Sequence, residues 1–116
     1  MGGRGFAIDV PVPVTSTISD NRAAVAESGV LGADVRDQFL AAIGEPVSNY
    51  FGIGGIMPRT DLGGLNLSTV PKVLIECGNM RNPVDAALMG DPQWRQLAAE
   101  GLSAGITRYL VQRLVP

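Results

Sequence analysis

The stretch Val70-Pro-Lys-Val-Leu-Ile-Glu-Cys-Gly-Asn-Met-Arg-Asn82 decides the fold class. Its centre holds three consecutive branched apolar residues, Val73, Leu74 and Ile75. Such a run without alternation is typical of a strand covered on both faces in a parallel sheet. We therefore predict an inner strand over residues 72–77, followed by a turn at Gly-Asn.

Two short signals after this strand predict helices. Asn82 followed by Pro83 is the pattern of an N-cap and a first helical residue, and it predicts a short helix that ends near Met89. The pair Asp-Pro at 91–92 repeats the pattern for a final helix. That helix places one broad apolar face toward the core, made of Trp94, Leu97, Ala98, Leu102, Ile106, Tyr109 and Leu110.

The chain before residue 70 predicts a strand, a loop, a helix and a second loop. Residues 5–10 form the strand, and residues 11–27 form a polar loop in which residues 22–27 could hold a helical turn. The helix runs from its N-cap Ser28 to Ile43 and stops at the Gly and Pro that follow. Residues 47–69 are rich in glycine and predict a long surface loop with a short strand.

This order of elements indicates an α/β fold in one domain, with a partial, mostly parallel sheet flanked by helices. The length of 116 residues allows one domain at most, against roughly 100–200 residues per domain. Two or three strands make a thin sheet for so continuous an inner strand. We therefore expect something else to cover or extend it.

Composition excludes several classes of function. The net charge of −2 argues against nucleic-acid binding, which needs a basic face. The chain has no His, so it cannot build a Ser–His–Asp or Cys–His site, nor a His-containing zinc site. No apolar run approaches the ~20 residues of a membrane span. The first residues contain no apolar stretch typical of a signal peptide.

Glu76 is the best candidate for chemistry. It ends the strongest predicted strand, and ligand sites of open α/β sheets collect at such ends. Burial there would raise the pKa of its carboxyl toward the range of a general base. The alternative is a structural Glu paired with Arg59 or Arg81.

Three other residues are weaker candidates. Arg59 and Asp61 lie in the glycine-rich segment, where they could contact a substrate or simply form a solvent-exposed pair. A phosphate-binding loop there is disfavoured, because Pro58 opposes the helix it would need. Cys77 has no His to activate it, so we expect a buried structural thiol.

Residues 70–82 resemble a signature of the zinc-dependent N-acetylmuramoyl-L-alanine amidases, which are bacterial peptidoglycan hydrolases. The shared pattern is a Pro, an apolar strand, a Glu, one residue, a Gly and, four residues on, an Asn. Residues 59–65, 98–109 and 3–8 also resemble this family, most closely its actinobacterial and mycobacterial-like members.

The resemblance implies a function, and it implies that part of the site is missing. It makes Glu76 the catalytic acid/base in hydrolysis of the amide between N-acetylmuramic acid and L-alanine. Asn82 matches the closing Asn, which the capping pattern makes structural. The family binds zinc through two His and one Glu that match no position here. We therefore interpret residues 1–116 as the C-terminal half of the catalytic domain, inactive alone and holding no metal.

The resemblance also implies peptidoglycan as partner and an extracellular, periplasmic or cell-wall location. An open sheet edge would favour self-association of the isolated chain. Two other interpretations stay open. One is a non-catalytic module that binds a peptide or a partner. The other is an unrelated small α/β protein whose strand-end Glu is structural.

Overall fold

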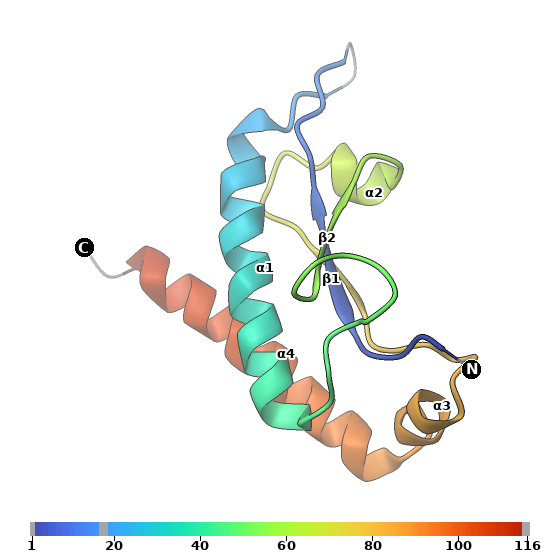
Figure 1. The fold of residues 1–116 in the computed structure, drawn as a ribbon. Helices are drawn as coiled ribbons and strands as arrows, with labels where there is room; N and C mark the ends of the chain where they lie inside the picture. Colours follow the sequence, from blue (N-terminus) through green and yellow to red (C-terminus); the bar gives the residue numbers. More distant parts are fainter. Residues whose placement is uncertain (1, 17–18, 115–116) are drawn as a thin grey trace.

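The computed structural model of the chain describes residues 2–16 and 19–114. Along the chain the elements are β1 (Ala7–Pro11), α1 (Arg22–Ile43), β2 (Ile56–Arg59), α2 (Gly63–Asn66), β3 (Leu74–Glu76), α3 (Pro83–Met89) and α4 (Pro92–Leu114). The three strands form one sheet, α1 lies along it, and α4 crosses behind α1 (Figure 1). The α/β class and the helices that flank the sheet confirm the prediction.

The sheet is mixed, with the strand order β2-β1-β3. β1 pairs in parallel with β2 but antiparallel with β3, so the predicted parallel pairing is correct for one neighbour and wrong for the other. β3 is also an edge strand rather than an inner strand, and its Leu74 is 41% exposed. An apolar run reports that a strand packs against a core, but it does not report strand direction.

The register across the sheet separates an apolar face from a polar face. Ile8 of β1 lies opposite Ile56 and Ile75, and these side chains point toward the core. Because successive side chains alternate between faces, Asp9 and its cross-strand partners Met57 and Leu74 lie on the other face. Ala7 pairs with Glu76, so the carboxylate of β3 shares the face of Asp9.

The core joins β1, α1 and α4 through aromatic side chains. The ring of Phe6 lies 4.8 Å from that of Phe39, and the Phe39 ring lies 6.3 Å from that of Trp94. Both pairs pack edge to face, an arrangement that adds to the stabilisation from burial alone. The predicted core role of Trp94 is therefore confirmed.

Helix α1 begins seven residues earlier than predicted, with Asn21 rather than Ser28 before its first residue, Arg22. Ser28 is not its N-cap but a buried residue of its second turn, and its hydroxyl accepts a hydrogen bond from the backbone N–H of Lys72 at 3.0 Å. Asn21 anchors the start instead, because its side chain bonds the backbone of Val12 and Val14. The predicted stop is confirmed, since Gly44 takes the left-handed conformation that ends the helix.

The buried face of α4 is narrower than predicted. Trp94, Ala98 and Tyr109 are buried, but Leu97, Ile106 and Leu110 are each close to half exposed. Gly101 and Gly105 complete the buried line where α4 crosses α1. A Cβ at Gly105 would lie 2.6 Å from Cα of Val35, so only glycine allows this close crossing.

The short helices follow their predicted signals. The side chain of Asn82 accepts hydrogen bonds from the backbone N–H groups of Val84 and Asp85, which caps α3 as predicted. Asp91 likewise accepts from the backbone N–H of Gln93 at the start of α4. In residues 2–16 and 19–114, no helix is long and apolar enough to cross a membrane.

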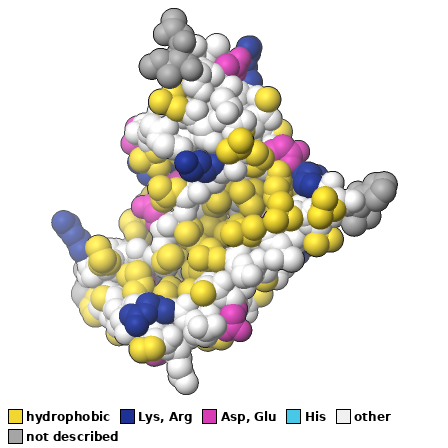
Figure 2. Space-filling view, turned by 180° about the vertical axis from the view of Figure 1, so that it is seen from behind, with side chains coloured by type: hydrophobic (Ala, Val, Ile, Leu, Met, Phe, Trp, Pro, Cys, Tyr) yellow, Lys and Arg dark blue, Asp and Glu magenta, His cyan; other side chains and the backbone are white. Residues whose placement is uncertain are grey.

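The outer side of β3 is flanked by apolar side chains that the described chain leaves uncovered. One groove lies between β3 and the α1–α4 pair, and it includes Leu31, Leu102 and Ile106. A second groove lies between β3 and α2 and includes Leu65. Figure 2 shows hydrophobic side chains gathered over the middle of the face seen from behind. The expectation that something else covers or extends this sheet therefore fits the surface.

Candidate active site

A cluster of charged side chains lies on the polar face of the sheet, and each strand contributes to it. Arg59 at the end of β2 donates from Nη1 to Oδ2 of Asp9 on β1, at 3.2 Å. It also donates to both oxygens of Asp61, each at 2.8 Å. Glu76 of β3 completes the cluster, with its Oε2 4.0 Å from Arg59 Nη1. The structure thus brings together all three residues predicted for the site.

The turn after β2 holds Arg59 in this position. Asn66 of α2 is buried, and its side-chain amide donates to the backbone carbonyl of Arg59 at 2.6 Å. The same side chain accepts from the backbone N–H of Leu62 at 3.1 Å. These two bonds close the segment that carries Arg59 and Asp61, so the guanidinium is aimed across the sheet rather than into solvent.

The carboxylates of the cluster differ in how far they are buried. Asp9 is fully buried, whereas the side chain of Asp61 is 63% exposed. Hydrogen bonding to Arg59 lowers the pKa of the Asp61 carboxyl and raises the pKa of the guanidinium. Burial, with a further contribution from Glu76, raises the pKa of Asp9 to about 7. Arg59 and Asp61 are therefore a fixed ion pair, and Asp9 is the group that titrates near neutrality.

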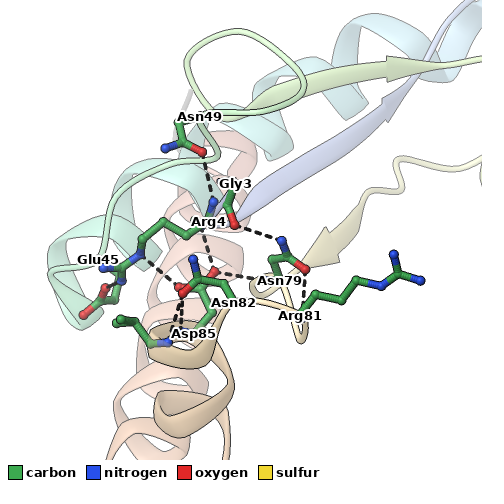
Figure 3. A network of polar contacts seen from close by, with 10 residues as sticks. Gly3, Arg4, Glu45, Asn49, Asn79, Arg81, Asn82 and Asp85 are labelled. Carbon is green, nitrogen blue, oxygen red and sulfur yellow. Dashed lines mark hydrogen bonds and ion pairs between the residues drawn. The ribbon is translucent and has the colours of Figure 1, made fainter. Parts of the chain in front are cut away.

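Glu76 is not fully paired by arginine. Its side chain is 40% exposed, and the guanidinium of Arg59 donates its side-chain hydrogen bonds to Asp9 and Asp61 instead. Arg81, the other predicted partner, extends away from the strand, and its backbone N–H donates to Asn79 (Figure 3). The alternative of a Glu paired with Arg59 thus corresponds to a long ion pair, with Oε2 of Glu76 4.0 Å from Nη1 of Arg59, and both interpretations of Glu76 stay open.

A second polar network fixes the loop that follows Glu76. Asp85 of α3 is buried and accepts hydrogen bonds from the backbone N–H groups of Gly5 and Asn79, both at 2.9 Å. It also pairs with Nε of Arg4 at 3.1 Å. Figure 3 shows these groups converging between the N-terminal segment and α3. The network clamps residues 78–82 to the chain just before β1, which fixes the end of β3.

Cys77 does not take part in the cluster. It is half-buried and packs against the core, and burial raises the pKa of its thiol. A thiol with a raised pKa is a poor nucleophile at neutral pH. This placement fits the structural role expected for it.

The donor set of the chain does not fit the zinc that the family resemblance implies. Among residues 2–16 and 19–114, no three His, Cys, Asp or Glu side chains are placed to hold a metal ion. The whole sequence contains no His, the usual nitrogen ligand of zinc. Ligands for such a metal would have to come from outside the residues described.

Sequence reasoning missed Asp9 and Asp85. Asp9 interrupts the apolar strand Phe-Ala-Ile-Asp-Val, and a charge at the centre of a buried strand is itself a signal. Asp85 lies three residues after Asn82, where an acidic side chain normally faces solvent in the first helical turn. Nothing in the local pattern indicates that it bonds residues about 80 positions earlier.

Comparison with known proteins gives the same assignment from several directions. The family model described as N-acetylmuramoyl-L-alanine amidase matches residues 4–108. An amidase of that name from Mycobacterium tuberculosis is 40% identical over 108 residues, which is 93% of this chain and 42% of the relative. The match therefore extends over nearly the whole chain.

Solved structures agree in fold and in coverage. The amidase Ami1 from Mycobacterium smegmatis superposes with a TM-score of 0.83 at 41% identity, covering 95% of this chain and 48% of that one. Ami1 from Mycobacterium abscessus gives 0.78 at 37% identity, covering 94% and 49%. The chain thus spans about half the length of the relatives it matches. On these grounds the chain belongs to the N-acetylmuramoyl-L-alanine amidase family.

Proposed function

We propose that this chain is the C-terminal half of an amidase catalytic domain and supplies its acid/base carboxylate. The complete enzyme hydrolyses the amide between the lactyl group of N-acetylmuramic acid and L-alanine in peptidoglycan. The observation that carries this proposal is Glu76, a half-exposed carboxylate at the end of β3 whose only ionic neighbour already bonds two aspartates. Family membership supports the reaction, and it rules out the interpretation of an unrelated α/β protein.

In this proposal Glu76 transfers one proton from the attacking water to the leaving amine. Its carboxylate accepts a proton from the attacking water and then delivers it to the leaving amine. Arg59 and Asp61 lie beside it on the same face, where the exposed Asp61 carboxylate offers an acceptor to substrate amide groups. The rigid turn after β2 keeps both at a constant distance from Glu76.

The uncovered apolar grooves beside β3 support the assignment to half of a domain. Leu31, Leu102 and Ile106 of the two long helices line the groove on one side of this edge strand, and its own exposed Leu74 lines the groove on the other side. An edge strand with apolar flanks also invites pairing with a second chain, so the isolated chain should self-associate at high concentration. Analytical ultracentrifugation against concentration measures this association.

A second candidate, a non-catalytic module, is favoured by these same grooves. Lys72 lies at both of them and offers a positive charge to a bound peptide. The two functions differ in what Glu76 does: it is needed for turnover in the first and lies outside the grooves in the second.

A substrate at the cell wall would place either form outside the cytoplasm.

The test joins these 116 residues to the part of a relative that they do not match. A chimera joins the unmatched N-terminal half of the Mycobacterium smegmatis relative to this chain, and release of L-alanyl peptide from muropeptides is measured with zinc. The amidase proposal expects turnover, and Glu76→Gln should lower it by roughly 10²–10⁴-fold at unchanged metal content. The 116-residue chain alone should show none.

Glu100→Gln is the matched control, because Glu100 is an exposed glutamate of α4 outside the cluster. Its turnover should equal that of the unmodified chimera. A folded chimera with metal bound and near-normal turnover after Glu76→Gln would remove Glu76 from the mechanism. An inactive but folded chimera that binds stem peptide would favour the non-catalytic module.

A further inference from the structure

The carboxyl groups of Asp9 and Glu76 each leave one oxygen without a bonding partner. Oδ1 of Asp9 and Oε2 of Glu76 are buried atoms that accept no hydrogen bond from the described residues. The other oxygen of Asp9 receives the Nη1 hydrogen bond of Arg59 at 3.2 Å. A buried polar atom without a partner costs about 1–3 kcal/mol, so two of them in one cluster require an explanation.

The positive charge in the cluster is too small to keep both groups ionised. Arg59 is the one cation that faces them, and it also forms a two-point hydrogen bond with Asp61. Two neighbouring carboxylates in a partly dry site do not both ionise, because each raises the free energy of the other's charge. Two acceptors can nevertheless satisfy each other if one of them carries a proton.

We propose that Asp9 and Glu76 share one proton, with the protonated Asp9 carboxyl donating a hydrogen bond to the Glu76 carboxylate. Asp9 is then a positioning residue that holds Glu76 ionised and oriented. The positioning role rests on the proposed function of Glu76, whereas the shared proton does not. The single proton gives both unsatisfied oxygens the partner that they lack.

The electrostatics of Asp9 support this pairing. Burial is the largest cause of the raised pKa of Asp9, about 7, followed by the hydrogen bond to Glu76 and its negative charge. Among the neighbouring elements, β3 contributes Glu76, β2 contributes Arg59, and the turn after it contributes Asp61. Arg59 acts in the opposite direction but does not cancel the rest. Helix α1 packs on the other face of β1 through apolar side chains.

The number of protons held by the Asp9–Glu76 pair returns to one at the end of each catalytic cycle. When Glu76 accepts a proton from water, the pair holds two protons, and it returns to one when the leaving amine takes a proton. Above about pH 7 Asp9 loses the shared proton, and Glu76 loses its donor. The amidase rate should therefore decline above neutrality through a group that is not Glu76 itself.

The test is a titration of the 116-residue chain by NMR, using ¹³C-labelled aspartate and glutamate carboxyls. The unmodified chain should show two separated steps for the pair, with the upper step near pH 7. Asp9→Asn should abolish the step near pH 7. Glu76→Gln should shift the titration of Asp9 downward. Asp37→Asn, at an exposed aspartate of α1 that pairs with Arg36 outside the cluster, is the control and should leave the step near pH 7 unchanged.

Several results would overturn the pairing. Independent titration of both carboxyls below pH 5 in the unmodified chain excludes a shared proton without any variant. An upper step that persists in Asp9→Asn assigns it to another group. An upper step that disappears with Mg²⁺ or Zn²⁺ alone would show a cation between the carboxylates instead. If the steps appear but the chimera is inactive, the pair stands and the proposed function fails.

Discussion

Asp85 and Asp9 are both buried aspartates, and they differ in how many hydrogen bonds their carboxylates receive. Asp85 receives two backbone N–H groups and the guanidinium of Arg4, so each of its oxygens is satisfied. Asp9 receives one hydrogen bond from Arg59 and keeps Oδ1 without a partner. Side-chain exposure does not separate them, since both lie below 10%.

The difference separates a carboxylate with a full set of donors from one that lacks a donor for one of its oxygens. The donors aimed at Asp85, together with the Asn79 side chain that donates to the Gly3 carbonyl, tie residues 3–5 to the loop after β3. Asp9 faces another carboxyl, and its charge is disfavoured by burial. A carboxyl whose charge is disfavoured by burial and by a neighbouring charge is therefore a candidate for a functional site.

The largest effect expected from this contrast is the loss of Asp85. Asp85→Ala leaves the guanidinium of Arg4 and two backbone N–H groups without their acceptor, and should lower the free energy of unfolding by about 3–5 kcal/mol. Urea denaturation followed by circular dichroism measures it. Asp37→Ala, which removes an exposed ion pair with Arg36, should cost only about 0–1 kcal/mol. Equal costs for the two variants would contradict the assigned role.

The stability of Asp9→Asn, relative to that of the unmodified chain, should increase as pH rises. The folded-state pKa of Asp9, about 7, lies above the ordinary aspartate value of 3.8, so the folded chain binds more protons than the unfolded chain between these values. The contribution of Asp9 to stability is thus present below about pH 4 and is lost as pH rises toward 7.

The stability of Asp9→Asn relative to the unmodified chain should therefore increase by about 1–4 kcal/mol from pH 4 to pH 8. Urea titrations of both chains at each pH measure this difference. Asp61→Asn is the comparison, because the depressed pKa of Asp61 predicts a relative loss, not a gain, as pH rises. A constant difference for Asp9→Asn would show that Asp9 is ionised throughout.

Gly105→Ala tests stability at a place that neither aspartate touches. The new Cβ would lie 2.6 Å from Cα of Val35, and the overpacked helix crossing should cost about 1–3 kcal/mol. The cost should be equal at pH 4 and pH 8, unlike that of Asp9→Asn. Gly29→Ala, at an exposed position of α1 with open space around it, should stabilise by about 0.5–1 kcal/mol. Thermal melts at both pH values compare them.

The smallest effect expected is that of zinc on the 116-residue chain. Because the described residues offer no three-ligand cluster, saturating zinc should leave Tm unchanged within error. Metal analysis after dialysis provides the second measurement. Stoichiometric zinc together with a raised Tm would show that carboxylates alone build a site here.

Much of the local structure could be predicted from short sequence signals. The caps at Asn82 and Asp91 and the stop at Gly44 act within one helical turn, so the residues themselves specify them. The start of α1 could not be placed, because its anchor Asn21 bonds a loop that the sequence does not position. The buried line of α4 was also hidden, since it depends on where α1 crosses it.

By itself the sequence determined the α/β class, the family and the position of Glu76, because a strand pattern and a spaced motif are local properties. The tertiary structure alone decided that β3 is an antiparallel edge strand and that Asp9 and Glu76 lie on the same face of the sheet. Those outcomes depend on pairing between segments more than 60 residues apart, and β-strand register carries no short-range signal. The candidate base can thus be found in the sequence, but its proton partner appears only when β1 and β3 lie side by side.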